Sequence, residues 1–497
     1  MYATWPPRRQ LLAAVLLLGP VAYFSLFYRL SSHPVVMWDE SRLACNAAEM
    51  LRNGNWLVTH FADRPDLWNT KPPLLVWLQA VLFLLMGPTE LALRLPSALA
   101  AVGTVALLAW FCHRVLRAPL LGLCGALVLL SCSGYIDRHV TRTGDYDTLL
   151  VFFTTWYALS FFRYLEDGSR SALYQAGAGV ALAVLTKGVA GVIPLPGLLL
   201  YCGLAGRLPW LVRQGRAYVV LAGVVAVVAA YYVGREIALP GYWAAVQENE
   251  LGGRLLGDKS FHTETTWTWY LDMLIHDELL PWLYLMPLGV VALLAREAPP
   301  VYRRFLLLLV VFVVVFLAII SSAVTKYYWY EAPIYPFCCL LAGAGVALLG
   351  EALVLRLSSQ RLRPWALLLL LGCLLVAPLT FIGKETEQYY TGRFADPDLL
   401  FGRYLRHQHE NFGQLEKYDL LSGIDYNATM EFYRSAAMLT YGHEVRARYP
   451  WDLKSFQPRD VVVVCNPATR AQLDSTYVTQ LLYEESPCAT LQIQTAR

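Results

Sequence analysis

The chain has 497 residues, of which 57% are hydrophobic and 15% are charged, and its formal net charge is +3. Soluble domains carry about 25% charged residues, so this composition excludes an ordinary soluble protein. Together with a mean hydropathy of +0.43, it predicts a chain embedded in a bilayer. The first apolar segment, residues 11–28, follows Arg8 and Arg9 without a cleavage pattern, and we expect it to be an uncleaved span.

Apolar runs that predict membrane helices follow one another along most of the chain. They lie at about 11–29, 73–87, 93–112, 119–134, 147–165, 171–186, 189–206, 216–234, 279–295, 305–322, 331–355 and 364–383. A span needs about 20 residues. The run at 73–87 is shorter and begins beside Pro72, so it is either a thin span or a half-embedded helix.

Basic loops decide between these two interpretations. If the run at 73–87 does not cross, the loops that fall on the same side as Arg8 and Arg9 are His113–Arg117, Arg163–Arg170, Arg207–Arg216, Arg296–Arg304 and Arg356–Arg363. Arginine-rich loops face the cytoplasm, and every one of these loops carries at least two arginines. We therefore expect about eleven crossings plus one half-embedded helix, with the C-terminal tail outside.

Residues 384–497 lack such runs and predict a separate soluble domain outside the cytoplasm. Strand-like segments (418–424, 443–449, 460–466 and 490–494) alternate with helix-like segments (427–439 and 468–477). This alternation predicts a small α/β domain. Cys465 and Cys488 lie within it and could form a disulfide, which spacing alone leaves open.

The first outer segment, 30–72, contains the first candidates for chemistry. Asp39 and Glu40 begin an amphipathic helix that ends near Gly54 and is expected to lie at the membrane surface. Asp39 can be the N-cap of this helix or a general base that takes a proton from an attacking hydroxyl. Lys71 either extends to lipid headgroups or contacts the phosphate of a lipid leaving group.

The second outer segment, 135–146, places Arg138, Arg142, Asp145 and Asp147 just before a span. Carboxylates at a membrane mouth are costly unless they are paired or used. Their Asp-Tyr-Asp spacing matches the metal-binding pattern of soluble transferases that use nucleotide sugars, but those donors are cytoplasmic. A helix N-terminus, where acids complement the dipole, explains the two acids equally well.

Two further outer segments are rich in aromatic residues. Segment 235–278 contains His262 and Glu264, and segment 323–331 contains Lys326 and Tyr330. These residues are candidates for contacts with a sugar, a phosphate or an acceptor. Trp and Tyr also gather at membrane interfaces without any such role.

The motifs resemble those of bacterial GT-C glycosyltransferases, in particular the aminoarabinose transferases acting on lipid A and the protein O-mannosyltransferases. The resemblance extends over roughly residues 10–385. It rests on the order of Trp-Asp-Glu-x-Arg (38–42), Asn-Trp (55–56), Lys-Pro-Pro-Leu (71–74), Arg-Thr-Gly-Asp-Tyr-Asp (142–147) and Ser-x-x-x-x-Lys (321–326).

The resemblance implies roles for several residues. Asp39 matches the proposed base, Lys71 matches the lysine that contacts the carrier phosphate, and Asp147, followed by Asp145, matches an acid of the substrate site. Aminoarabinose transferases have Glu where this chain has Thr70, and that Glu is associated with a metal together with a later His resembling His262. The departure removes the basis for expecting a metal cofactor, or aminoarabinose as the sugar.

We therefore predict an enzyme of the bacterial plasma membrane that moves a sugar from polyprenyl phosphate to a glycolipid, glycan or protein outside the cytoplasm. Asp39, Lys71 and Asp147 are the expected catalytic residues, and the expected substrate contacts are Glu40, Arg42, Arg142, Asp145, His262, Lys326 and Tyr330. No nucleic-acid partner is expected. The alternatives are a flippase for lipid-linked sugars, a protein O-mannosyltransferase proper, and a non-catalytic sensor that uses the C-terminal domain.

Overall fold

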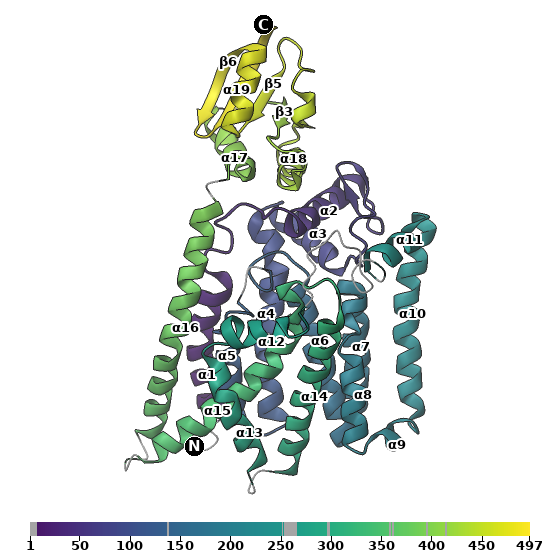
Figure 1. Ribbon diagram of the computed structural model, residues 1–497, viewed down its shortest axis with the longest axis vertical. Helices are drawn as coiled ribbons and strands as arrows, with labels where there is room; N and C mark the ends of the chain where they lie inside the picture. The colour runs from purple at the N-terminus through teal and green to yellow at the C-terminus, as the bar shows by residue number, and fades with distance from the viewer. Residues whose placement is uncertain are drawn as a thin grey trace.

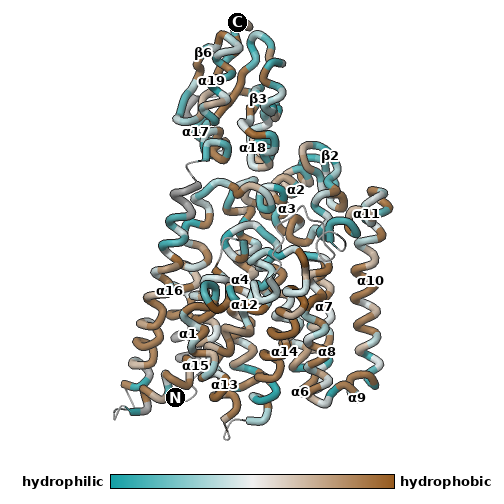
Figure 2. Tube along the Cα trace, in the orientation of Figure 1, coloured by the Kyte–Doolittle hydropathy of each residue, from teal (hydrophilic) through white to brown (hydrophobic). Residues whose placement is uncertain are grey.

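The computed structural model describes residues 7–136, 139–250, 252, 266–295, 299–356, 359, 362–393, 396–412 and 415–497. It consists of a bundle of long helices with a small sheet-containing domain at one end (Figure 1). Hydrophobic residues dominate the helices of the bundle, whereas polar residues gather at the end that carries the domain (Figure 2). We call this end the domain side.

Each apolar run predicted from the sequence coincides with a helix. The bundle helices are α1 (Pro7–Ala22) with η2 (Tyr23–Phe27), α3 (Leu74–Met86), α4 (Glu90–Arg114), α5 (Pro119–Leu129), α6 (Asp147–Asp167), α7 (Arg170–Lys187), α8 (Leu195–Leu204), α9 (Leu208–Leu211), α10 (Gly215–Ala238), α13 (Met286–Leu294), α14 (Pro300–Ser322), α15 (Tyr335–Leu355) and α16 (Arg363–Arg393). The prediction of a polytopic helical protein is confirmed.

Length and composition qualify six helices of the described residues as membrane spans. A seventh results if Trp269–Glu278 and Trp282–Leu294, bent by 96°, form one span. Shorter apolar helices lie at Val15–Phe27, Leu74–Met86, Pro119–Leu129 and Leu195–Leu204. The helix Leu74–Met86 has 13 residues, which suits a half-embedded helix. The predicted count of about eleven crossings is reached only if the bent pair, the other three short apolar helices and α6 all cross the membrane. That count stays a prediction.

Short elements connect the helices of the bundle. They are α2 (Asp39–Asn53), the antiparallel strands β1 (His60–Phe61) and β2 (Arg64–Pro65), η3 (Gly188–Gly191), α11 (Tyr242–Val246), α12 (Trp269–Met273), η5 (Leu274–Glu278), η6 (Trp282–Leu285) and η7 (Tyr328–Ile334). The apolar face of α2, with Leu43, Ala47 and Met50, is buried. Protein rather than lipid covers it, because α2 packs against α3 and against α18 of the C-terminal domain.

The C-terminal domain has a five-stranded sheet in the order β4-β3-β5-β7-β6. Its elements are η8 (Pro397–Leu399), α17 (Phe401–Phe412), β3 (Lys417–Leu421), α18 (Ala428–Tyr441), β4 (Glu444–Arg448), η9 (Pro450–Asp452), β5 (Val461–Val464), α19 (Pro467–Thr476), β6 (Tyr477–Glu485) and β7 (Cys488–Ala496). Strand β3 is parallel to β4 and β5, and β7 is antiparallel to β5 and β6.

The predicted α/β domain is confirmed, with two additions. Strand β6 pairs with β7 as an antiparallel hairpin that the sequence did not predict, and α16 continues to Arg393, beyond the expected domain boundary at residue 383. Cys465 and Cys488 form a disulfide between the end of β5 and the start of β7.

Candidate active site

The start of α2 presents the Asp39 carboxylate. Trp38, not Asp39, is the N-cap: its carbonyl accepts hydrogen bonds from the Arg42 backbone N–H (3.0 Å) and the Ser41 hydroxyl (3.1 Å). The interpretation of Asp39 as an N-cap is therefore wrong. Asp39 is half-buried, and within the described part of the chain its carboxylate has no hydrogen bond or ion pair. It is available to accept a proton.

Glu40, the next residue, is fully buried and uses both of its carboxylate oxygens. Oε1 accepts from Arg94 Nε (2.7 Å) and the Gly144 backbone N–H (2.9 Å). Oε2 accepts from the Val36 backbone N–H (2.7 Å) and Arg94 Nη2 (3.0 Å). Because a buried ion pair needs such additional hydrogen bonds to be tolerated, Glu40 joins the first outer segment to α4 and to the second outer segment.

Arg42 lies one turn into α2 and forms a two-pronged ion pair with Asp66. Arg42 Nε and Nη2 donate to Asp66 Oδ2 and Oδ1 at 2.8 and 2.7 Å. The guanidinium also stacks on the Phe61 ring, 3.7 Å from its centroid. Burial raises the pKa of Asp66, but the hydrogen bonds and charge of Arg42 outweigh it and hold that pKa below its usual value. Both charges are thus used to fold the segment between α2 and α3.

Lys71 enters the site from the segment before α3. Its Nζ lies 3.7 Å from Glu250 Oε1 and 5.7 Å from the centroid of the Tyr146 ring. Thr70 Oγ1 donates to the same Glu250 oxygen at 3.0 Å. The lysine side chain is 10% exposed, so its charge is largely shielded from bulk solvent and would act strongly on a nearby phosphate.

The surroundings of Glu250 do not fit a divalent cation. An ammonium group and a hydroxyl donor are directed at this carboxylate, and a cation would have to displace both. No group of three or more His, Cys, Asp and Glu side chains suited to a metal occurs among the residues that the structure describes. His262, the other residue that the resemblance associates with a metal, lies outside the described residues, as do Glu264 and Arg138.

Asp147, the first residue of α6, forms a buried ion pair with Lys187. The distance from Lys187 Nζ to Asp147 Oδ1 is 2.6 Å, and the same Nζ lies 5.6 Å from the centroid of the Tyr330 ring. We did not identify Lys187 from the sequence. Its position could have indicated a role, because it is a single lysine between the apolar runs 171–186 and 189–206. A charged residue so close to the membrane is costly unless it is paired.

Asp145 forms a second polar contact close by. Its Oδ2 accepts a hydrogen bond from Thr143 Oγ1 (2.9 Å) and lies 3.6 Å from His139 Nδ1. The His139 ring stacks on Trp329 with 4.0 Å between ring centroids. Burial raises the pKa of Asp145, and the Asp39 carboxylate adds to that rise although His139 opposes it. The start of α2 adjoins this segment, because Glu40, the residue after Asp39, accepts a hydrogen bond from the Gly144 backbone N–H.

Two further predicted residues, Arg142 and Lys326, bond to backbone carbonyls. Arg142 donates from Nη1 to the Ser25 carbonyl (2.8 Å) and from Nη2 to the Tyr28 carbonyl (2.6 Å), which ties the second outer segment to the end of the first helix. Lys326 is buried and donates to the Ala323 carbonyl at 2.9 Å.

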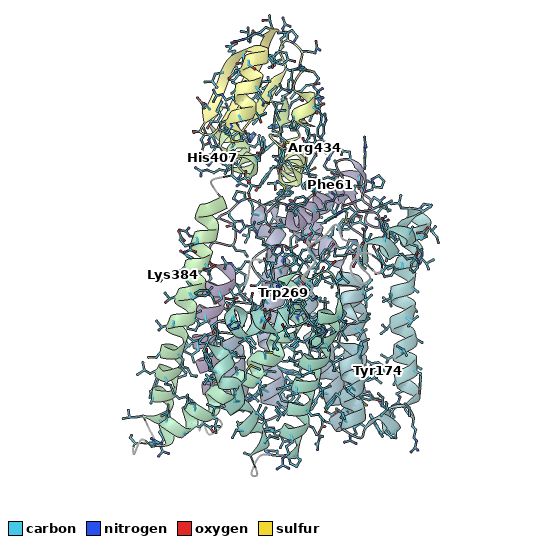
Figure 3. All side chains as sticks on the ribbon, in the orientation of Figure 1. Phe61, Tyr174, Trp269, Lys384, His407 and Arg434 are labelled. Atoms are coloured by element: carbon cyan, nitrogen blue, oxygen red, sulfur yellow. A yellow bond between two sulfur atoms is a disulfide. The ribbon has the colours of Figure 1, made fainter. Side chains whose placement is uncertain are left out.

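Residues 145–147 lie at the centre of this arrangement. Glu40, next to Asp39, binds the Gly144 backbone, Lys71 lies beside Tyr146, and Lys187 binds Asp147. The site thus combines two lysines next to the apolar bundle with a carboxylate that has no partner in the part of the chain that the structure describes. Above it, Phe61 and Arg434 mark the junction with the C-terminal domain (Figure 3).

Sequence comparison supports the resemblance. Residues 70–233 match the family model described as dolichyl-phosphate-mannose-protein mannosyltransferase. The undecaprenyl phosphate-α-4-amino-4-deoxy-L-arabinose arabinosyl transferase of Aeromonas salmonicida is 30% identical over 275 residues, which are 53% of this chain and 48% of that protein. The chain spans about half the length of the curated relatives that it matches.

Structural comparison extends over nearly the whole chain. ArnT from Cupriavidus metallidurans, in its structure bound to undecaprenyl phosphate, aligns with 96% of this chain and 97% of its own at a TM-score of 0.68 and 18% identity. The archaeal oligosaccharyltransferase AglB from Archaeoglobus fulgidus aligns with 98% of this chain and 74% of its own, at a TM-score of 0.53 and 12% sequence identity. At these identities the likeness establishes the fold: the chain is a multi-pass membrane protein with the GT-C fold, and the predicted resemblance is confirmed.

Proposed function

We propose that the protein is a membrane glycosyltransferase that moves a sugar from a polyprenyl-phosphate carrier to an acceptor hydroxyl outside the cytoplasm. The observation that carries this proposal is the Asp39 carboxylate, which has no hydrogen bond or ion pair among the described residues. It lies next to Glu40, which binds the backbone of Gly144, and Lys71 lies against the nearby Tyr146 ring. A transfer of this kind needs one group to take a proton and another to stabilise a phosphate leaving group. The arabinosyl transferases and the mannosyltransferase family that the chain resembles are named for such donors.

The reaction is a single inverting displacement. Asp39 accepts the proton of the acceptor hydroxyl while that oxygen forms a bond to the anomeric carbon. The bond from the anomeric carbon to the phosphate oxygen breaks, and polyprenyl phosphate leaves with the electron pair. Lys71 stabilises the charge that develops on the phosphate. Holding the two substrates in line at the membrane edge contributes much of the rate.

Several residues that we expected to contact substrate receive positioning roles instead. Glu40, Arg42 and Arg142 use their charged groups on Arg94, Asp66 and backbone carbonyls. Asp147 neutralises Lys187, so we assign it to positioning rather than to catalysis. Asp145, Lys326 and Tyr330 remain candidates for contacts with the sugar or the phosphate, and His262 keeps its role as a prediction from the sequence.

We place the site and the C-terminal domain outside the cytoplasm of a bacterial plasma membrane. Disulfides persist in oxidising compartments, and the bond between Cys465 and Cys488 supports that location. The arginine-rich loops support the same orientation. A reporter that is active only in the cytoplasm, fused after Arg497, should stay silent. An active fusion would contradict the orientation.

Transfer with purified protein in lipid nanodiscs tests the proposed function. Undecaprenyl-phosphate aminoarabinose and polyprenyl-phosphate mannose serve as labelled donors, with total envelope glycolipids and an envelope protein extract as acceptors. Label should appear on an acceptor while polyprenyl phosphate is released. Movement of intact donor across a vesicle membrane without release would instead identify a flippase.

Lys71→Ala provides the matching site variant. A hydrogen bond to a charged group contributes about 1.5–3 kcal/mol, so loss of the ammonium should weaken donor binding roughly ten- to a hundredfold and lower turnover. Lys384→Ala, which removes an exposed lysine on α16 (Figure 3), is the control and should bind donor like the wild type. Equal donor binding by both variants would argue against the role of Lys71.

A further inference from the structure

An aromatic side chain of the C-terminal domain reaches the start of α2. Tyr426, in the connection between β3 and α18, stacks on Trp38 with 5.1 Å between ring centroids and 21° between ring planes. It also stacks on Phe61, at 5.9 Å. Its hydroxyl accepts a hydrogen bond from Arg42 Nη1 at 3.4 Å. The tyrosine thus contacts the residue before Asp39 and the arginine one turn after it.

Trp38 has a backbone conformation that a side chain disfavours. Its φ is +79°, in the left-handed half of conformational space, which costs free energy for any residue with a Cβ and persists only where the surroundings enforce it. Trp38 is 62% exposed, so burial in a core does not hold it there. The stack with Tyr426 is the contact that its indole ring makes across the domain boundary.

The Trp38 conformation determines where α2 begins. Trp38 is the N-cap, and its carbonyl accepts the hydrogen bond of the Arg42 backbone N–H. Asp39 follows directly as the first helical residue. A change at the Trp38 backbone would therefore displace the Asp39 carboxylate, and a small displacement of a base from the reacting hydroxyl is costly in rate.

Other contacts dock the C-terminal domain independently of Tyr426. The Tyr433 hydroxyl donates to Glu90 Oε1 (2.8 Å), and Arg434 Nη2 pairs with Asp63 Oδ2 (2.8 Å). Thr429 Oγ1 donates to the Val35 carbonyl at 3.2 Å. Because these contacts remain in a Tyr426 variant, the domain should stay docked and the effect of the tyrosine can be measured separately.

We infer that Tyr426 is a positioning residue for the transfer: by stacking on Trp38 it holds the turn that presents Asp39, so the C-terminal domain completes the active site. This inference rests on the proposed function. It assigns the domain a part in catalysis, exerted through the Trp38 backbone rather than by direct contact with the reacting atoms.

Steady-state transfer by five variants, among them Trp38→Gly alone and combined with Tyr426→Leu, tests the inference. Tyr426→Leu should lower kcat about tenfold with a smaller change in KM, and Tyr426→Phe, which keeps the ring, should stay within about threefold of the wild type. Glycine adopts positive φ without penalty. In a Trp38→Gly background, Tyr426→Leu should therefore cost less than about twofold, because the two residues act through one backbone turn. Trp451→Leu, which removes the stack of Trp451 on Tyr449 within the domain, is the control and should turn over like the wild type.

Hydrogen exchange supplies a readout that does not depend on transfer. The backbone N–H groups of Ser41 and Arg42 bond to the carbonyls of Val36 and Trp38, and their exchange should speed up about tenfold in Tyr426→Leu and not in Trp451→Leu. Unchanged exchange, or a kcat for Tyr426→Leu equal to that of Trp451→Leu, would overturn the inference. A wild-type protein that transfers no sugar, combined with faster exchange in Tyr426→Leu, would refute the proposed function and leave the positioning contact standing.

Discussion

Helices α2 and α6 begin with the same local pattern, but the aspartates at their starts differ in whether a lysine neutralises them. Each has an aromatic N-cap followed by an aspartate: Trp38 and Asp39 in α2, Tyr146 and Asp147 in α6. Tyr146 has a relaxed φ of −67°, whereas Trp38 has a φ of +79°. Lys187 lies 2.6 Å from the Asp147 carboxylate. The Asp39 carboxylate has no such partner among the described residues.

This difference separates a structural acid from a reactive one. A carboxylate that neutralises a buried lysine stabilises the fold, and protonating it would leave the lysine unpaired. A general base needs a lone pair that is free to accept a proton. Strain at the residue before Asp39 fits a site held in place for function. We therefore expect the two aspartates to respond differently to the same substitution.

The largest effect is expected for Asp39→Asn. Removal of a general base costs about 10² to 10⁴ in rate, and kcat should fall within that range while donor binding and thermal stability stay close to those of the wild type. Because Trp38 is the N-cap, the substitution does not remove a cap. Near wild-type turnover would remove Asp39 from the mechanism and favour Asp145.

Asp147→Asn should act on stability instead. Breaking a buried ion pair by removing one partner costs about 3–5 kcal/mol, and Lys187 would be left without its counter-charge. Thermal unfolding in detergent should show this loss, and Asp147→Asn combined with Lys187→Met should recover part of it. If Asp147→Asn unfolded like the wild type but lost turnover, the catalytic role would return to Asp147.

Glu49, further along α2, should make stability depend on pH. Burial raises its pKa to about 7, with the nearby Asp63 charge adding to the rise, and its Oε1 lies 4.0 Å from Arg434 Nη2. The folded state holds this proton more tightly than the unfolded state, so the stabilisation is complete below the unfolded pKa and is lost as pH rises through about 7.

Unfolding of Glu49→Gln and wild-type protein across pH 5 to 8 measures this effect. Glutamine stays neutral, so Glu49→Gln should be more stable than the wild type at pH 8, by on the order of 2 kcal/mol. The difference should shrink toward pH 5. A gap that is independent of pH would show that Glu49 does not titrate in this range.

The smallest effect is expected from removal of metals. Lys71 and Thr70 direct their donors at Glu250, so transfer should continue in the presence of a chelator. Turnover that fell in chelator and returned with a divalent ion would contradict this expectation.

The arrangement of elements along the chain could be predicted from the order of the residues. Hydrophobic runs predicted the helices, and alternating strand-like and helix-like segments predicted the C-terminal sheet domain. The arginine-rich loops predicted the orientation of the chain, which stays a prediction. These features can be predicted because hydropathy, helix length and loop charge depend on residues that are close together in the sequence. For the same reason the sequence indicated which segments lie on the domain side, and so it brought Asp39, Lys71 and residues 142–147 into one candidate site.

Which charged groups are paired and which are available follows from the three-dimensional arrangement of the elements. Lys187 and Asp147 are 40 residues apart in the sequence, and Arg94 and Glu40 are 54 residues apart. Tyr426 and Arg42, which are hydrogen-bonded, are 384 residues apart. Ion pairs and stacking depend on separations of a few ångströms, and spacing along the chain does not encode such distances between separate elements. The local pattern of an aromatic residue followed by aspartate therefore could not distinguish Asp39 from Asp147, whereas the position of one lysine does.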